Sequence, residues 1–277
     1  MAMTAPGDGN RRLCLAWAGL AGVLVLTLAG CAGQGAPGDV GSSRDIVTES
    51  DEPEVRKRAR IRMELAVGYF EQGQTNVALD ELKQVIAFDP TFPDAYNLRG
   101  LIYMRLNDMR QAEDSFRRAV TLSPRDSNVQ HNYGWLLCQQ ARYDESVRAF
   151  EAAMANPTYG GRAKTLLAQG VCQARAGRNA EAERSLARSY ELDAGNPVTG
   201  YNLASLLYRR GDYARAQFYI RRLNNTELAN AETLWLGVKV ERRLNDEVAM
   251  NQLGEQLRKR FGQSREAASF NRRAFDE

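Results

Sequence analysis

The chain has 277 residues, of which 44% are hydrophobic and 26% are charged, so it can bury a core and whole-chain disorder is excluded. Lys and Arg number 37 against 34 Asp and Glu, and this small surplus of interspersed charges excludes the dense basic surface of a nucleic-acid binder. A single histidine, His131, argues against a multi-histidine metal site, and four cysteines without CxxC spacing argue against a zinc ribbon.

Residues 1–30 have the pattern of a bacterial lipoprotein signal peptide. Arg11 and Arg12 precede an apolar run, Leu13 to Gly30, which ends in Leu-Ala-Gly followed by Cys31. A basic start, an apolar stretch and small residues before the cut are typical of a secretory signal. The last four residues resemble the lipobox, in which the cysteine is acylated and becomes the new N-terminus, so we predict lipidation there. The alternative is a retained transmembrane anchor, because the run is just long enough to span a bilayer.

Residues 31–53 are expected to tether the protein to a membrane. Ala32, rather than Asp, follows the cysteine, and by resemblance to proteobacterial lipoproteins this favours sorting to the outer membrane. The segment 32–53 is rich in Gly, Ser, Pro and Asp, which is typical of a flexible linker with an r.m.s. span of roughly 25 Å. The predicted location is the periplasmic face of the outer membrane, with a covalent lipid on Cys31 and no other cofactor.

A repeat with a period close to 34 residues begins after the linker. Small residues recur in the first helix of each expected unit, and a second small residue follows each of them by twelve positions. The first set is Ala66, Gly100, Gly134, Gly170, Ala204 and Gly237, and the second is Ala78, Ala112, Ser146, Ala182, Ala216 and Ala249. Successive members are 34, 34, 36, 34 and 33 residues apart. This is the tetratricopeptide pattern, in which small residues let two helices pack closely.

The predicted fold is therefore all-α: a right-handed α-solenoid of about six tetratricopeptide (helix-turn-helix) repeats with a C-terminal capping helix. The repeat domain spans residues 54–277, and the cap is expected between Arg258 and Phe275. The repeats are expected at approximately 59–92, 93–126, 127–160, 163–196, 197–229 and 230–262. Two extra residues near 156–161 predict an irregular joint between the third and fourth repeats.

The sequence contains no pattern that indicates catalysis. It has no P-loop, GxGxxG or HExxH motif, and a lone histidine gives no basis for a Ser-His-Asp set. Acidic pairs at expected helix starts complement helix N-termini and solvate the surface. We predict a protein-binding scaffold rather than an enzyme, with no metal and no small-molecule substrate.

The inner surface of the solenoid is the candidate binding site. In this fold the first helix of each unit lines the groove, mainly three residues before, one after and four after its small residue. The candidates are Met63, Val67, Phe70, Asn97, Leu101, Met104, Trp135, Tyr201 and Tyr208, and the same rule also selects His131, Cys138, Leu234, Val238 and Glu241. The first repeats carry an apolar patch, which favours a protein partner, and burial in the core is the alternative. No lysine stands where a carboxylate clamp needs one, which disfavours binding of a C-terminal carboxylate.

Cys138 and Cys172 are predicted to form a disulfide. Once the signal is removed and Cys31 carries lipid, they are the only pair left in an oxidising compartment. They lie on the first helices of successive repeats, which pack side by side, so we expect Cα atoms within about 7 Å. Two buried free thiols are the alternative.

Several stretches resemble the PilW/PilF family of type IV pilus biogenesis and stability lipoproteins. They are residues 131–140 (HNYGWLLCQQ), 142–145 (RYDE), 155–157 (ANP), 170–172 (GVC), 206–213 (LLYRRGDY) and 234–237 (LWLG). With the lipobox and the repeats, the resemblance covers nearly the whole expected mature chain. It implies a pilotin, an outer-membrane lipoprotein that binds the secretin subunit of the type IV pilus machinery and promotes its localisation and multimerisation. The alternative is another periplasmic repeat scaffold, for outer-membrane barrel assembly or for organising peptidoglycan enzymes.

Overall fold

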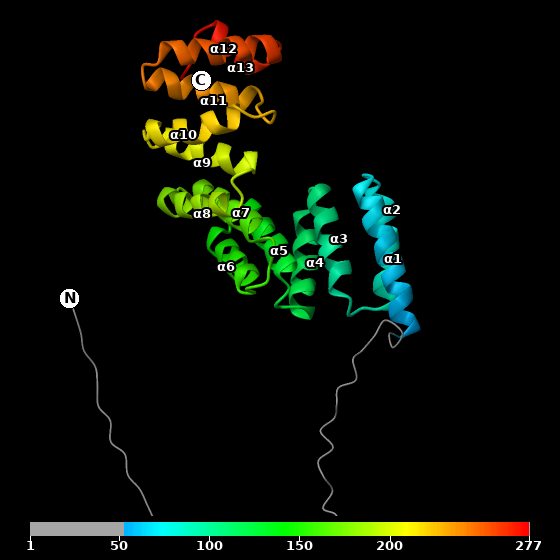
Figure 1. The fold of residues 1–277 in the computed structure, drawn as a ribbon. Coiled ribbons are helices and arrows are strands. Elements are labelled where there is room, and N and C mark those ends of the chain that lie inside the picture. Colours follow the sequence, from blue (N-terminus) through cyan, green and yellow to red (C-terminus); the bar gives the residue numbers. More distant parts are fainter. Residues whose placement is uncertain (1–52, 277) are drawn as a thin grey trace, which may run out of the picture. The chain divides into compact units, whose positions relative to one another are not determined.

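The structure is a computed structural model that describes residues 53–276, all within one compact unit, Glu49–Glu277. The predictions for the signal, for Cys31 and for the linker up to residue 52 lie outside the described residues. Within 53–276 the chain forms thirteen helices and no strand (Figure 1). They are α1 (Glu54–Glu71), α2 (Thr75–Phe88), α3 (Pro93–Arg105), α4 (Met109–Leu122), α5 (Ser127–Gln139), α6 (Tyr143–Met154), α7 (Arg162–Arg175), α8 (Asn179–Leu192), α9 (Pro197–Arg209), α10 (Tyr213–Asn224), α11 (Ala231–Arg243), α12 (Glu247–Phe261) and α13 (Arg265–Asn271).

The helices are organised as six helix-turn-helix pairs, from α1 with α2 to α11 with α12. Each second helix also packs against the first helix of the next pair, and the first helices of successive pairs touch one another. Figure 1 shows the resulting stack, in which each pair contacts its neighbours in the sequence. Contacts limited to neighbouring units define a repeat solenoid, so the predicted all-α repeat fold is confirmed.

The turn inside each pair fixes the register of the repeats. One residue of each turn has left-handed backbone, with φ between 59° and 82°: Gly73, Asn107, Ala141, Gly177, Gly211 and Asn245. Their numbers are 34, 34, 36, 34 and 34 apart. The two extra residues of the third interval lie between Met154, where α6 ends, and Arg162, where α7 begins. The irregular joint is therefore where the sequence predicts it.

The turn of the sixth repeat keeps the 34-residue period, which places the groove positions of α11 one residue later than the interval of 33 residues to Gly237 predicts. Its turn residue, Asn245, follows Gly211 by 34 positions. In this register Val238, which is 0% exposed, occupies the position where the first helices of earlier repeats carry a small residue. Gly254 occupies the position where the second helices of earlier repeats carry a large residue. The room at Gly254 is filled by Phe270. Gly237, one position before Val238, still packs closely on the second helix, because a Cβ there would lie 3.0 Å from Leu253.

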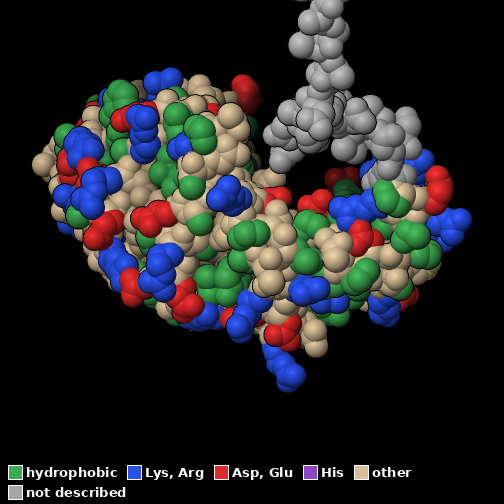
Figure 2. Space-filling view, turned by 90° about the horizontal axis from the view of Figure 1, so that it is seen from below, with side chains coloured by type: hydrophobic (Ala, Val, Ile, Leu, Met, Phe, Trp, Pro, Cys, Tyr) green, Lys and Arg blue, Asp and Glu red, His purple; other side chains and the backbone are tan. Residues whose placement is uncertain are grey.

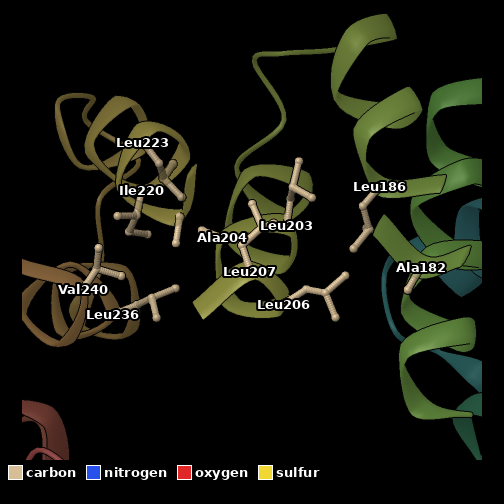
Figure 3. Close-up of a cluster of buried hydrophobic side chains, with 11 residues drawn as sticks. Ala182, Leu186, Leu203, Ala204, Leu206, Leu207, Ile220, Leu223, Leu236 and Val240 are labelled. Atoms are coloured by element: carbon tan, nitrogen blue, oxygen red, sulfur yellow. The ribbon is translucent and has the colours of Figure 1, made fainter. Parts of the chain in front are cut away.

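The core consists of clusters shared between neighbouring repeats rather than one central mass. In the largest, Leu203 and Leu206 of α9 extend toward Leu186 on one side, and other α9 side chains meet Ile220 on the other (Figure 3). Inside a repeat, glycine allows close packing, because a Cβ on Gly100 would lie 2.7 Å from the Phe116 ring. The same close approach joins Gly134 to Phe150 and Gly170 to Leu186.

The C-terminal end of the array is covered by α13 and the residues that follow it. Phe270 packs against α12 where Gly254 leaves room, because a Cβ on that glycine would overlap the Phe270 ring. Phe275 stacks on Trp235 of α11, with ring centres 5.7 Å apart. The predicted capping helix is therefore present as α13.

The surface of the described residues carries mixed charge. Figure 2 shows basic and acidic side chains interspersed on one face, with apolar side chains between them. Among residues 53–276, no helix combines the length and the apolar character that a membrane span requires.

Candidate protein-binding groove

The nine predicted groove residues lie on the first helices α1, α3, α5 and α9. None of them is fully buried: eight are half-buried, and Val67 is 37% exposed. They therefore form the accessible side of these helices while still packing on the core beneath.

On the first repeat, Met63 and Phe70 pack against the core cluster of α1, α2 and α3, and Val67 lies on the same face between them. Arg105 of the next repeat closes one side of this patch. Its guanidinium carbon is 5.5 Å from the centre of the Phe70 ring, and its Nη1 donates a 3.3 Å hydrogen bond to the Phe70 carbonyl. The patch is apolar in its middle and bordered by a cation.

On the second repeat, Leu101 and Met104 pack on the cluster that contains Phe116. Asn97 points to the third repeat, where its Oδ1 accepts a 3.1 Å hydrogen bond from Nδ2 of Asn132. Leu101 and Met104 are therefore partly core residues, so their substitution tests packing as well as binding. Val67 is the more selective probe of the surface.

The third and fourth repeats are joined by a disulfide between Cys138 of α5 and Cys172 of α7, whose Cα atoms are 5.7 Å apart. This pairing and the Cα separation are as expected from the sequence. Trp135 packs on the same cluster, and the guanidinium carbon of Arg175 lies 5.3 Å from its ring. The disulfide therefore links the two central repeats within the cluster on which Trp135 packs.

His131 and Cys138 do not line the groove, which corrects the position rule for the third repeat. His131 is 6% exposed, and its Nδ1 lies 2.9 Å from Oγ1 of Thr165 on α7. Burial, with a smaller contribution from the charge of Lys164, lowers the imidazole pKa to about 4. The side chain is therefore neutral at pH 7 and serves to join α5 to α7.

The rule also fails in the sixth repeat, where Leu234, Val238 and Glu241 are each 0% exposed. Glu241 faces α10, where it accepts hydrogen bonds of 2.6 Å from Arg221 Nε and 2.7 Å from Gln217 Nε2. The cause is the one-residue register error described above. The correct register moves the groove positions to the next residues along α11.

The corrected register selects Trp235 and Lys239, which the structure brings together with Tyr201 and Tyr208 of α9. These side chains line a cavity of about 320 Å³, together with Ser205, Arg209, Glu232, Leu236 and, from α13, Glu266. The Lys239 Nζ is 5.8 Å from the centre of the Tyr208 ring and 5.6 Å from that of Trp235. Burial lowers the pKa of Lys239, against an opposing effect of Asp276.

These arrangements offer apolar and aromatic surface to a partner molecule. Within residues 53–276, no three His, Cys, Asp or Glu side chains come together as metal ligands would. The accessible features are the apolar patch of Met63, Val67 and Phe70 on α1 and the aromatic cavity between α9, α11 and α13.

Comparison with known proteins agrees with the repeat architecture. Sequence models of the tetratricopeptide repeat match residues 68–107, 93–126 and 134–197. The chain is 24% identical to the type IV pilus assembly protein PilF of Pseudomonas aeruginosa over 253 residues, which cover 91% of this chain and 97% of PilF.

Two solved structures extend this similarity to the fold. That of PilW, a widely conserved type IV pilus biogenesis factor, matches with a TM-score of 0.72 at 28% identity, covering 79% of this chain and 99% of PilW. That of Pseudomonas aeruginosa PilF matches with a TM-score of 0.71 at 24% identity, covering 80% of this chain and all (100%) of PilF. The chain is therefore a tetratricopeptide repeat protein that is similar in sequence and fold to PilF and PilW, which are proteins of type IV pilus assembly and biogenesis.

Proposed function

We propose that this protein is a pilotin: a non-catalytic outer-membrane lipoprotein that binds the type IV pilus secretin and promotes its localisation and multimerisation. The observation that carries the proposal is the apolar patch of Met63, Val67 and Phe70 on α1. An accessible apolar surface of this kind favours a protein partner. The relationship to PilF and PilW supports a partner within the pilus machinery.

Three parts of the chain divide the work in this proposal. Acyl chains on Cys31 supply membrane affinity, at about 0.8 kcal/mol for each buried CH₂ group. Residues 32–53 supply reach, because a Gly- and Ser-rich linker keeps its ends apart without fixing their distance. The apolar patch on α1, continued by Leu101 and Met104 on α3, supplies recognition.

The first test compares two valines of the first repeat. Val67 on α1 is 37% exposed and Val77 on α2 is 39% exposed, so glutamate at either position leaves the core intact. Only Val67 lies in the proposed binding patch. In a strain lacking the native gene, Val67→Glu should lower the amount of heat-resistant secretin multimers, whereas Val77→Glu should restore the wild-type amount. Equal multimer levels with the two variants, at equal protein abundance, would contradict the proposal.

The second test separates a pilotin from another repeat scaffold. Loss of the protein should remove secretin multimers and leave other outer-membrane barrel proteins unchanged. A general loss of barrel proteins would favour a barrel-assembly role instead. In a strain without the secretin, Cys31→Ala should move the protein out of the outer-membrane fraction, and its retention there would contradict lipid anchoring.

A further inference from the structure

We propose that the cavity between α9, α11 and α13 is a second peptide-binding site, for an extended segment with one acidic side chain beside a large apolar one. The site lies in the last two repeats, at the other end of the array from the patch on α1. It rests on different residues and does not depend on the pilotin function. Its occupant is a segment of a partner protein.

The apolar part of such a segment fits the aromatic walls. Tyr201 and Tyr208 are half-buried on α9, and Trp235 of α11, which is only 7% exposed, also lines the cavity. Aromatic side chains give a large contact area at low cost in conformational entropy, which is why they dominate binding hot spots. Trp235 is also held in place from behind by the stacked Phe275 ring, so this wall is formed before a ligand arrives.

The acidic part fits Lys239. Its ammonium group is near the rings of Tyr208 and Trp235, and it makes no ion pair with any residue between 53 and 276. Asp276 acts on it from a longer distance and is itself paired with Arg242 and Arg243. A half-buried cation without a carboxylate partner gains most from a ligand that supplies one. Charge complementarity therefore selects a carboxylate for the position next to Lys239.

The other charges of the cavity limit the ligand to one acidic group. Glu232, Glu266 and Arg209 also line the cavity. The two carboxylates raise the pKa of Tyr201, after the larger effect of burial, and Arg209 lowers it. Because the two glutamates outnumber the one arginine, they repel a second carboxylate on the Tyr201 side. A polyacidic segment is therefore a poorer ligand than one with a single Asp or Glu.

The cavity is open along the groove, which favours an internal segment over a chain end. It shares Trp235, Lys239 and Glu266 with a cavity of about 260 Å³ toward α13. In the other direction it shares Arg209 with a cavity of about 380 Å³ that reaches α7. An extended chain can pass through all three, with its acidic side chain next to Lys239.

The experiment measures the fluorescence anisotropy of short labelled peptides with the full chain in detergent. The peptides have both ends blocked and contain Phe-Asp-Leu, Leu-Asp-Leu or Trp-Glu-Leu between serines. We expect at least one of them to bind, and we expect its Asp→Asn or Glu→Gln form to bind about tenfold more weakly. A peptide with three successive acidic residues should also bind more weakly.

Two lysine substitutions assign the binding to the cavity. Lys239→Met should weaken the acidic peptide about tenfold and leave its amide form unchanged, and Lys239→Arg should retain most of the affinity. Lys259→Met on α12 removes the same charge from an exposed position outside the cavity and should have no effect.

Four results would overturn the proposal. They are no binding of any of the three peptides at about 1 mM, equal affinity for the acid and amide forms, an equal effect of the two methionine variants, or binding only when the C-terminal carboxylate is free. The peptide comparisons use the unaltered protein, so they decide the matter even if Lys239→Met fails to fold.

Discussion

The two ends of the array differ in whether a further helix covers the outermost repeat. At the first repeat, Ile61 and Leu65 of α1 remain 56% and 44% exposed, because no described helix packs on that side. At the last repeat, α13 covers α11 and α12, and Phe270 is only 6% exposed. Ala95, which follows Ile61 by one 34-residue period, is 0% exposed. A repeat position therefore fixes which side of a helix a residue occupies, whereas burial depends on whether a neighbouring unit is present.

The inner surfaces of the two ends also differ in chemistry. The patch on α1 is aliphatic and aromatic, and Arg105 of α3 lies over its Phe70 ring. The cavity on α9 and α11 instead holds a lysine between aromatic rings. We therefore expect the two ends to select different ligands, and the following substitutions test how far the ends differ in packing as well.

The largest expected difference comes from one substitution made in adjacent repeats. Ile102→Ala on α3 removes a 0% exposed side chain and should lower the free energy of unfolding by about 2–5 kcal/mol. Ile61→Ala on α1 changes a side chain that is 56% exposed and should cost less than about 0.5 kcal/mol. Urea unfolding monitored by circular dichroism measures both. Similar losses of unfolding free energy for the two variants would show that the side of α1 that carries Ile61 is covered.

The stability of the joint between the third and fourth repeats is expected to depend on the Cys138–Cys172 disulfide. Reduction opens a link between residues 34 apart in sequence and should lower the free energy of unfolding by about 2–4 kcal/mol. Thiol titration of the denatured protein should find two more thiols after reduction than before. An unchanged count would mean that Cys138 and Cys172 are free thiols.

The same joint should weaken in acid because of His131. Its folded pKa of about 4 lies below the ordinary value of 6.5, so the unfolded chain binds more protons between these pH values. Stability is therefore complete above pH 6.5 and is lost as the pH falls toward 4, by about 2 kcal/mol at pH 5.

A matched variant separates the contribution of His131 to the pH dependence of stability from that of the carboxylates, which titrate in the same pH range. His131→Asn keeps a polar side chain near Thr165 but cannot take up a proton. The wild type should lose about 2 kcal/mol more than this variant between pH 7 and pH 5, measured by urea unfolding at each pH. Equal losses would place the imidazole in contact with water.

The sequence predicts the repeat architecture well, because its signals are local and recur in every unit. Gly100 and Phe116 show why: a missing Cβ and a large ring sixteen residues later are both visible in the sequence and meet inside one repeat. The disulfide is predictable for a similar reason, since equivalent levels of neighbouring first helices lie side by side.

Other features escape sequence analysis because they depend on the neighbouring unit. In the sixth repeat Val238 occupies the small-residue position, and the predicted register follows Gly237 one residue earlier, although the turn at Asn245 keeps the 34-residue period. Lys239 is missed for that reason alone. The burial of His131 is missed because its partner, Thr165, lies one repeat further on.

The smallest expected effect concerns Gly68 on α1, which occupies the same repeat position as Ile102 does on α3. A Cβ added to Gly68 would meet no atom within 4 Å. Glycine in a helix costs about 0.5–1 kcal/mol relative to alanine, so Gly68→Ala should stabilise the protein by about that amount. Gly100→Ala on α3 should destabilise it instead, because its Cβ would lie 2.7 Å from the Phe116 ring. Thermal unfolding of the two variants gives the signs directly. A loss of stability on Gly68→Ala would mean that another chain segment occupies the open side of α1, and the contrast between the two ends would then disappear.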